Sequence, residues 1–227
     1  MKQISVIFSV FIISVSCTEK KKKCDFKQTN VEISIYNDVL TELVEEHFYY
    51  RYLGKEGEAI MSKHYAESID SVQEAKQIIH AHNKLFGKPT LFKTIYLRDE
   101  NVSDSIISNN FSYYNYGRSR SLDKMIASIS TNKKSVLDSI SLPQFKYKAK
   151  DFHACNFKIK SVSDNGIKKF NSEIGFIGFS KIFINKDEAI LRSDFNCGGL
   201  CGKGYILKLK NIDNHWKIIE WYKIWIS

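Results

Sequence analysis

The chain has 227 residues, of which 43% are hydrophobic and 26% charged, with only 2 prolines and 11 glycines. This composition excludes an intrinsically disordered, collagen-like or low-complexity protein, and it predicts one folded body with a substantial core. The net charge of +9 leaves nucleic acid, anionic lipid and acidic glycans open as partners.

The N-terminus has the pattern of an export signal. A short basic start, Met1 to Gln3, precedes an uncharged apolar run from Ile4 to Val15. A helix needs about 20 apolar residues to cross a hydrocarbon core of roughly 30 Å, so this run is too short for a permanent span. The sequence therefore predicts a signal peptide over residues 1–16, which is removed from the mature protein.

The residues that end this run, Ser14-Val15-Ser16-Cys17, resemble the lipobox of bacterial lipoproteins. The resemblance implies that the Cys17 thiol receives a diacylglyceryl group, and that the leader is cleaved just before it. Each buried CH₂ of the acyl chains would then add about 0.8 kcal/mol to membrane binding. Ser14 stands where Leu is usual, and ordinary signal peptidase cleavage, which leaves Cys17 unmodified, is the alternative.

Residues 17–35 are predicted to form a lipid-anchored tether. Four lysines, Lys20 to Lys23, follow the first polar residues of this segment. We interpret them as a solvated spacer; the alternative is that they lie on anionic head groups.

The cysteines stand at positions 17, 24, 155, 197 and 201. If Cys17 carries lipid, the other four form an even set in an oxidising compartment, with three possible pairings. Cys197 and Cys201 are the natural couple because a five-residue turn brings their Cα atoms into disulfide range. Cys24 would then pair with Cys155 and join the tether to the body. A zinc site is disfavoured because Cys-x₃-Cys lacks a second close pair and a nearby His, and a redox pair because it requires Cys-x-x-Cys at the start of a helix.

Apolar residues at spacings of three and four predict three helices: residues 36–53, 71–86 and, more weakly, 121–140. Asn37 or Asp38 is expected to cap the first helix, and residues 71–74 match a capping box for the second. A strand is predicted over residues 91–97, and an irregular one around residues 111–116.

The C-terminal part changes to strand patterns. Alternating apolar residues and turn signals predict these runs: 157–162, 176–184, 188–196, 204–210 and 216–226. Successive runs with short turns predict an antiparallel meander, with Tyr205, Leu207 and Leu209 on one face and Lys208 and Lys210 on the other. Helices followed by a meander give an α+β class, with residues 36–227 as a single α+β domain whose N-terminal helices pack on a curved antiparallel sheet.

Two further resemblances bear on this part. Residues 178–182, 185–187, 197–202 (Cys-Gly-Gly-Leu-Cys-Gly) and 216–218 resemble the C-terminal part of Bacteroidetes-type lipoproteins, for which no activity is established. The resemblance supports an envelope location and the strand order. The final hairpin is loosely similar to cystatin-like and nuclear-transport-factor-like folds, in which a curved sheet wraps a long helix.

Ligand-binding candidates come from two segments. The glycine-rich turn at residues 197–204 could form a backbone nest for an anion with Lys203, although a disulfide-closed hairpin is the favoured interpretation. Tyr114, Tyr116 and Arg118 belong to an aromatic and basic cluster that suits a glycan or is plain surface. Nucleic acid is not expected as a partner of an exported protein.

Catalytic and metal-binding patterns are weak. His80 and His82 are two residues apart on a helix and so face different ways, which argues against a shared metal ion. His47 beside Glu45 and Glu46 is interpreted as a packed side chain, and Ser121 as a helix cap. No catalytic residue, metal ligand or cofactor is predicted.

The sequence thus favours a lipid-anchored protein of the cell envelope, in the outer membrane and facing the periplasm or the cell surface. Its domain is predicted to be a non-catalytic binding or structural module, with a glycan or a protein as partner. The alternative is a secreted hydrolase whose nucleophile is Cys197 or Ser121.

Overall fold

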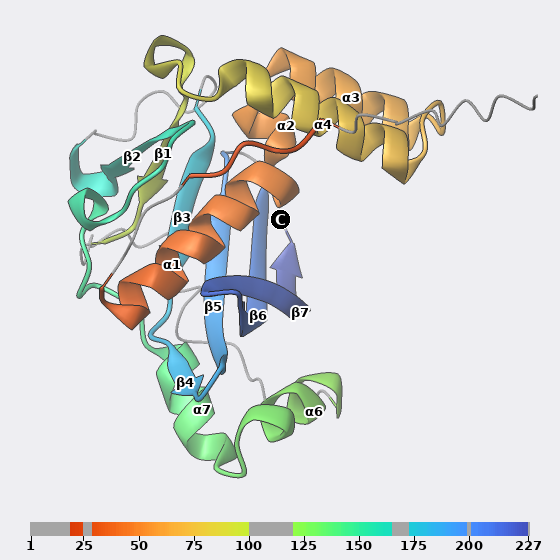
Figure 1. The fold of residues 1–227 in the computed structure, drawn as a ribbon. Coiled ribbons are helices and arrows are strands. Elements are labelled where there is room, and N and C mark those ends of the chain that lie inside the picture. Colours follow the sequence, from red (N-terminus) through yellow and green to blue (C-terminus); the bar gives the residue numbers. More distant parts are fainter. Residues whose placement is uncertain (1–18, 25–28, 100–119, 165–172, 199–200, 227) are drawn as a thin grey trace, which may run out of the picture.

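The computed structural model describes residues 19–24, 29–99, 120–164, 173–198 and 201–226 (Figure 1). A seven-stranded sheet lies at the centre, and helices pack on both of its faces. The helices are α1 (Val31–Glu42), a π-helix (Leu43–His47), α2 (Tyr49–Tyr52), α3 (Lys55–Tyr65), α4 (Ser71–Leu85), α6 (Arg120–Ile129) and α7 (Lys133–Ser141). The strands are β1 (Thr94–Leu97), β2 (Lys158–Ser161), β3 (Gly175–Phe179), β4 (Phe183–Asn185), β5 (Glu188–Asn196), β6 (Gly202–Ile212) and β7 (His215–Ile226).

The sheet is mixed, with strand order β2-β1-β3-β5-β6-β7 and with β4 paired to β5. Strands β3, β5, β6 and β7 form the predicted antiparallel meander. Strand β1, however, pairs in parallel with both β2 and β3, which corrects the prediction of a wholly antiparallel sheet. Parallel neighbours require long crossovers, and the chain between β1 and β2 carries α6 and α7. The predicted α+β class is confirmed.

The main core lies between the sheet and the first helices. Helix α1 and the π-helix bury most of their apolar side chains against strands β1, β3, β5 and β6, with Ile35, Val39 and Leu43 at 0% exposure. The Tyr36 hydroxyl donates a hydrogen bond to the Ser180 carbonyl at 2.8 Å. This burial explains why a segment rich in β-branched residues, which are weak helix formers, is helical.

The first helix begins earlier than predicted. Asn30 caps α1, and its side chain accepts a hydrogen bond from the Ile33 backbone N–H at 3.2 Å. Residues 31–35 are therefore helix and not tether, and Asn37 and Asp38 lie inside the helix, where their side chains accept hydrogen bonds from other segments.

The next two helices differ from the sequence patterns as well. Helix α3 was not predicted, because its exposed surface carries few apolar residues. In α4 the cap is Asp70, one residue before the predicted box, and it exchanges hydrogen bonds with Gln73. The apolar stripe predicted for this helix meets the core in its later turns, where His82 is buried and Ile78 and Leu85 pack against the core, but Val72 at its start is 63% exposed.

Two short helices occupy the segment predicted as one. Helices α6 and α7 are separated at residues 130–132, and they cover the opposite face of the sheet at Ile190 and Ile206. Lys208 was expected on an open face, but it is buried there, bonded to Ser128 Oγ at 2.8 Å and to Glu188 Oε1 at 3.0 Å.

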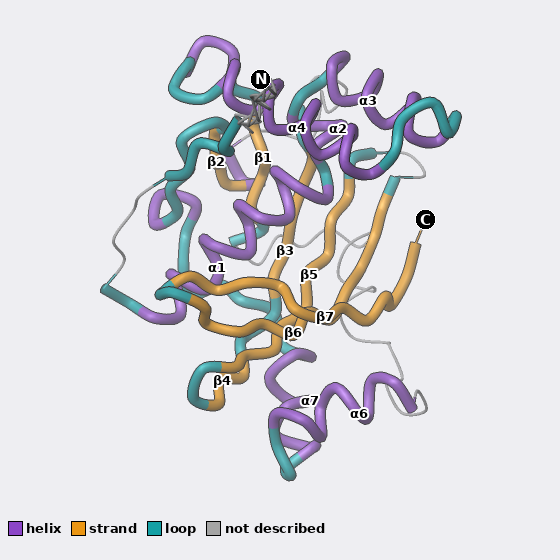
Figure 2. Tube along the Cα trace, turned by 45° about the vertical axis from the view of Figure 1, so that its right-hand side comes forward, coloured by secondary structure: helices purple, strands orange, loops and turns teal. Residues whose placement is uncertain are grey.

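Strand β7 forms one edge of the sheet and curls toward α1 (Figure 2). Its first half therefore runs beside α1, and the strand stays paired with β6 along its whole length. Within the described ranges, none of the helices combines the length and the apolar character that crossing a membrane requires.

Candidate functional site

Residues 19–24 form a strap that lies on α4. The Asn83 side chain amide donates to Glu19 Oε1 at 3.0 Å and to the Lys20 carbonyl at 2.9 Å, while its oxygen accepts from the Lys22 N–H at 2.9 Å. This part of the lysine-rich segment is thus held by the domain, whereas the sequence predicted a solvated spacer. Residues 1–18, which include the predicted signal peptide and Cys17, lie outside the described residues.

The strap covers a buried polar network at the π-helix. His82, which is 1% exposed, donates from Nε2 to the Lys22 carbonyl at 3.0 Å, so its Nδ1 is the acceptor that faces Tyr52 and Asn156 at 3.3 Å each. Burial lowers the pKa of His82 and keeps the imidazole neutral. Asn156 Nδ2 also donates to Glu45 Oε1 at 2.5 Å.

Lys21 brings the charge that balances this network. Its ammonium lies 2.8 Å from Glu45 Oε2 and 3.0 Å from Glu46 Oε1. Burial opposes the charged form of Lys21, but the two carboxylates outweigh this effect and raise its pKa. The strap and the π-helix are therefore joined by an ion pair as well as by hydrogen bonds.

The structure places two cysteine pairs at disulfide distance, in the pairing that the sequence predicted. The Cα atoms of Cys24 and Cys155 are 5.7 Å apart, and those of Cys197 and Cys201 are 5.3 Å apart. The first pair fixes the strap to the body. The second closes the turn between β5 and β6.

Acidic side chains follow one face of α1 and meet the edge strand β7. Asp38 Oδ2 accepts from the Trp216 N–H at 2.8 Å, and Glu42 accepts from the Ile218 N–H at 3.3 Å. These carboxylates thus accept backbone hydrogen bonds of β7 that a neighbouring strand would otherwise accept. Burial raises the pKa of both groups.

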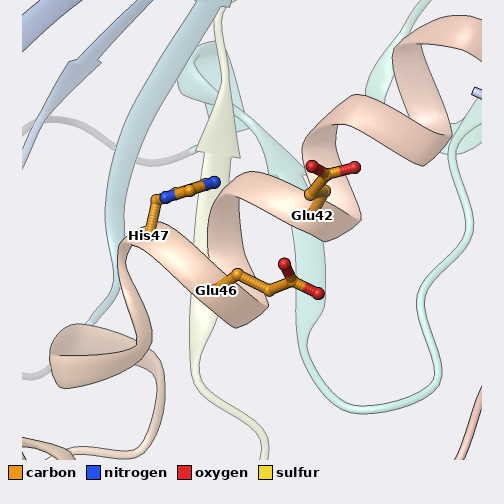
Figure 3. Close-up of side chains that lie close together, drawn as sticks. All are labelled: Glu42, Glu46 and His47. Atoms are coloured by element: carbon orange, nitrogen blue, oxygen red, sulfur yellow. The ribbon is translucent and has the colours of Figure 1, made fainter. Parts of the chain in front are cut away.

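Glu42, Glu46 and His47 bring one possible metal-ligand atom each within 4.8 Å of the others (Figure 3). Two carboxylates and an imidazole are a donor set that transition metals accept. Lysines already hold these carboxylates, however, with Lys217 3.6 Å from Glu42 and Lys21 3.0 Å from Glu46. A cation would have to displace both ammonium groups, so the arrangement is better described as an ion-pair cluster.

Beside this cluster lies a group of side chains that we call the aromatic corner: His47, Tyr50, Lys203, Tyr205 and Trp221. The His47 ring meets Trp221 edge-on at 4.1 Å, and Tyr205 lies 5.4 Å from Trp221. Lys203 Nζ lies 5.9 Å from the Tyr50 ring. Burial, with a smaller effect from the charge of Lys203, lowers the pKa of His47 to about 4, so the ring is neutral at pH 7.

The structure brings only one of the predicted ligand-binding residues to this corner. Lys203 Nζ lies by the Tyr50 ring, whereas Tyr114, Tyr116 and Arg118, like residues 199–200 of the glycine-rich turn, lie outside the described residues. His47 was expected to be a packed side chain, and its contact with Trp221 agrees. Ser121 lies inside α6, not in front of it.

A second charged group was not predicted. Arg192 is fully buried in β5, with Nε 2.8 Å from Asp194 Oδ2, and the Trp225 indole N–H donates to Asp194 Oδ1 at 2.8 Å. Burial raises the pKa of Asp194. Side chains alternate along β5, so Arg192 and Asp194 lie on the face opposite the main core. The same alternation in the sequence could have predicted that these two residues share a face.

Comparisons with protein-family models, with curated proteins and with solved structures give no match for this chain. The resemblance to cystatin-like and nuclear-transport-factor-like folds, and that to Bacteroidetes-type lipoproteins, stay predictions. The residues themselves define an α+β domain with a strap, an ion-pair cluster and an aromatic corner.

Proposed function

We propose that this chain is a lipid-anchored protein of the cell envelope whose domain is a non-catalytic binding module. The supporting observation is the position of the strap. Glu19, the first described residue of the strap, already contacts the domain and comes only two residues after Cys17. A chain of two residues spans at most about 7 Å, so lipid on Cys17 would hold the domain close to the bilayer surface.

Two cysteine pairs at disulfide distance agree with an oxidising compartment, as the envelope lipoprotein hypothesis requires. We also propose that the anchor lies in an outer membrane and that the domain faces the periplasm or the cell surface.

The anchor is tested by metabolic labelling with palmitate in a bacterial host, comparing the wild type with Cys17→Ser. The wild type is expected to carry label and to sediment with membranes, and the variant to lose both. Cys197→Ser is the matched control, because it changes another cysteine and leaves the lipobox intact. If the wild-type protein carries no label, the lipid anchor is contradicted, and the protein would be an exported soluble one.

The alternative, a secreted hydrolase, needs an available nucleophile. Cys197 is at disulfide distance from Cys201, and α6, which carries Ser121, lies at the opposite end of the molecule from α4 with His80 and His82 (Figure 1). Free-thiol counting under denaturing, non-reducing conditions should find no thiol in the lipidated protein. A thiol at Cys197 or Cys201 would favour the hydrolase.

A further inference from the structure

The aromatic corner is an open platform on the sheet. Lys203 and Tyr205 of β6 and Trp221 of β7 share the sheet face that α1 covers elsewhere, since Trp221 stands opposite the core residue Leu207. The helical layer ends beside them with His47 and Tyr50. Trp221 remains 42% exposed, and its ring is held between His47 and Tyr205. A large aromatic ring that is both exposed and fixed in orientation is a ready contact surface.

The charges at the corner are unbalanced. Glu42 is paired with Lys217, Glu46 shares Lys21 with the buried Glu45, and His47 is neutral at pH 7. Lys203 and Lys223, which lie on the same face, form no ion pair with any described residue. The positive charge of these two lysines is therefore available to a ligand.

We infer that the aromatic corner binds an anionic carbohydrate. The flat, apolar face of a sugar ring stacks on Trp221, and the carboxylate or sulfate of the sugar pairs with Lys203, with Lys223 next to it. A neutral sugar would leave the lysines unused, and a purely apolar partner would desolvate them without compensation. This inference rests on the proposed binding function and names its ligand class.

The test uses the full mature protein, purified with its lipid in detergent, and three hexasaccharides: oligogalacturonate, chondroitin sulfate and neutral cellohexaose. Titration calorimetry is expected to give a Kd below about 1 mM for at least one of the anionic probes at low salt. Binding should weaken at least about tenfold in 0.5 M NaCl and be at least about tenfold tighter than to cellohexaose. Oligogalacturonate offers carboxylates alone and chondroitin sulfate both carboxylates and sulfates, so binding of chondroitin sulfate without oligogalacturonate identifies sulfate recognition.

Two variants locate the site. Trp221→Ala should weaken anionic binding by more than about tenfold, and Lys203→Met by about fivefold with a shallower salt dependence. Lys210→Met is the matched control, since Lys210 is an exposed lysine of the same strand on the other face, and its binding should equal that of the wild type. Thermal unfolding of each variant verifies that it is folded, and Trp221→Phe, which keeps an aromatic face, should retain most of the affinity.

The inference is overturned if neither anionic probe binds, if cellohexaose binds as well as they do, or if Trp221→Ala binds like the wild type. Failure of the proposed function would be visible separately, because palmitate labelling of Cys17 does not depend on these side chains.

Discussion

The carboxylates of Asp38 and Glu42 in α1 accept backbone hydrogen bonds from the edge strand β7, as a neighbouring strand would. Asp38→Ala removes the acceptor of the Trp216 N–H, and we expect it to lower the free energy of unfolding by about 1–2 kcal/mol, the cost of an unsatisfied, partly buried donor. Asp38→Asn keeps an acceptor oxygen and should cost less. Urea denaturation measures both, with the exposed Glu58→Ala of α3 as the control. If Asp38→Asn and Asp38→Ala lower the free energy of unfolding equally, the charge of Asp38 and not its hydrogen bond causes the effect.

His82 should make stability depend on pH. Its pKa is lowered by burial, so the unfolded chain binds more protons than the folded one below about pH 6.5. Stability is therefore expected to fall as the pH drops from 7.5 to 5.5, by up to about 1.4 kcal/mol per pH unit for this one proton. Glu45, Lys21 and Tyr52 face the ring; the pKa of Lys21 is raised by its two carboxylates and that of Tyr52 by burial, so neither of these two groups changes charge over this interval.

The measurement is urea denaturation at both pH values. His82→Gln should flatten the pH dependence more than His80→Gln, which changes an exposed histidine of the same helix whose ring lies 3.2 Å from Glu19. A wild-type slope that survives in His82→Gln would show that other groups cause it.

Single residues were predictable where the signal is local. The opposite orientation of His80 and His82 follows from helical geometry, and the pairing of Cys197 with Cys201 follows from the length of a turn. The network of Glu45, His82 and Asn156 was not predictable, because Asn156 is 74 residues from His82 and 111 residues from Glu45 in the sequence. Periodicity describes which face a residue takes, not which distant side chain it meets.

At the scale of elements, α2 and α3 pack through a glycine. A Cβ atom on Gly57 would lie 2.6 Å from the Tyr49 carbonyl oxygen and 2.8 Å from the Tyr50 Cα, and these backbone atoms cannot rotate away. Helix propensity alone predicts that Gly57→Ala stabilises α3 by up to about 1 kcal/mol. We expect the opposite, a loss of about 1–3 kcal/mol from overpacking, measured by urea denaturation. Ser62→Ala, exposed on the same helix, is the control and should be neutral or slightly stabilising.

The elements that sequence patterns missed share a physical cause. The meander of β3, β5, β6 and β7 was predicted because consecutive strands with short turns pair with each other. The parallel pairing of β1 was missed because a strand of four residues, Thr94–Leu97, buried on both faces, has no alternation that reports its partners. Helix α3 was missed because most of its surface faces solvent, which leaves a weak apolar stripe.

At the scale of the whole molecule, the two cysteine pairs close very different loops. Cys24 and Cys155 are 131 residues apart, and Cys197 and Cys201 only 4. Chain-entropy arithmetic gives about 5 kcal/mol for the long loop and about 2 kcal/mol for the short one. The long-range link also holds the strap on His82 and Glu45, so its loss should release those contacts too.

We therefore expect Cys24→Ala/Cys155→Ala to lower the free energy of unfolding more than Cys197→Ala/Cys201→Ala, by about 2–3 kcal/mol in urea denaturation without reductant. The first variant should also become sensitive to limited trypsin digestion at Lys20 to Lys23, because the strap that carries these lysines would no longer be fixed at its end. The second variant should keep the strap as resistant as in the wild type. The prediction is wrong if both variants lose the same free energy of unfolding, or if trypsin cuts the strap equally in both. The strap would then be held by its polar contacts alone. The position of the domain relative to Cys17 would not depend on the covalent link.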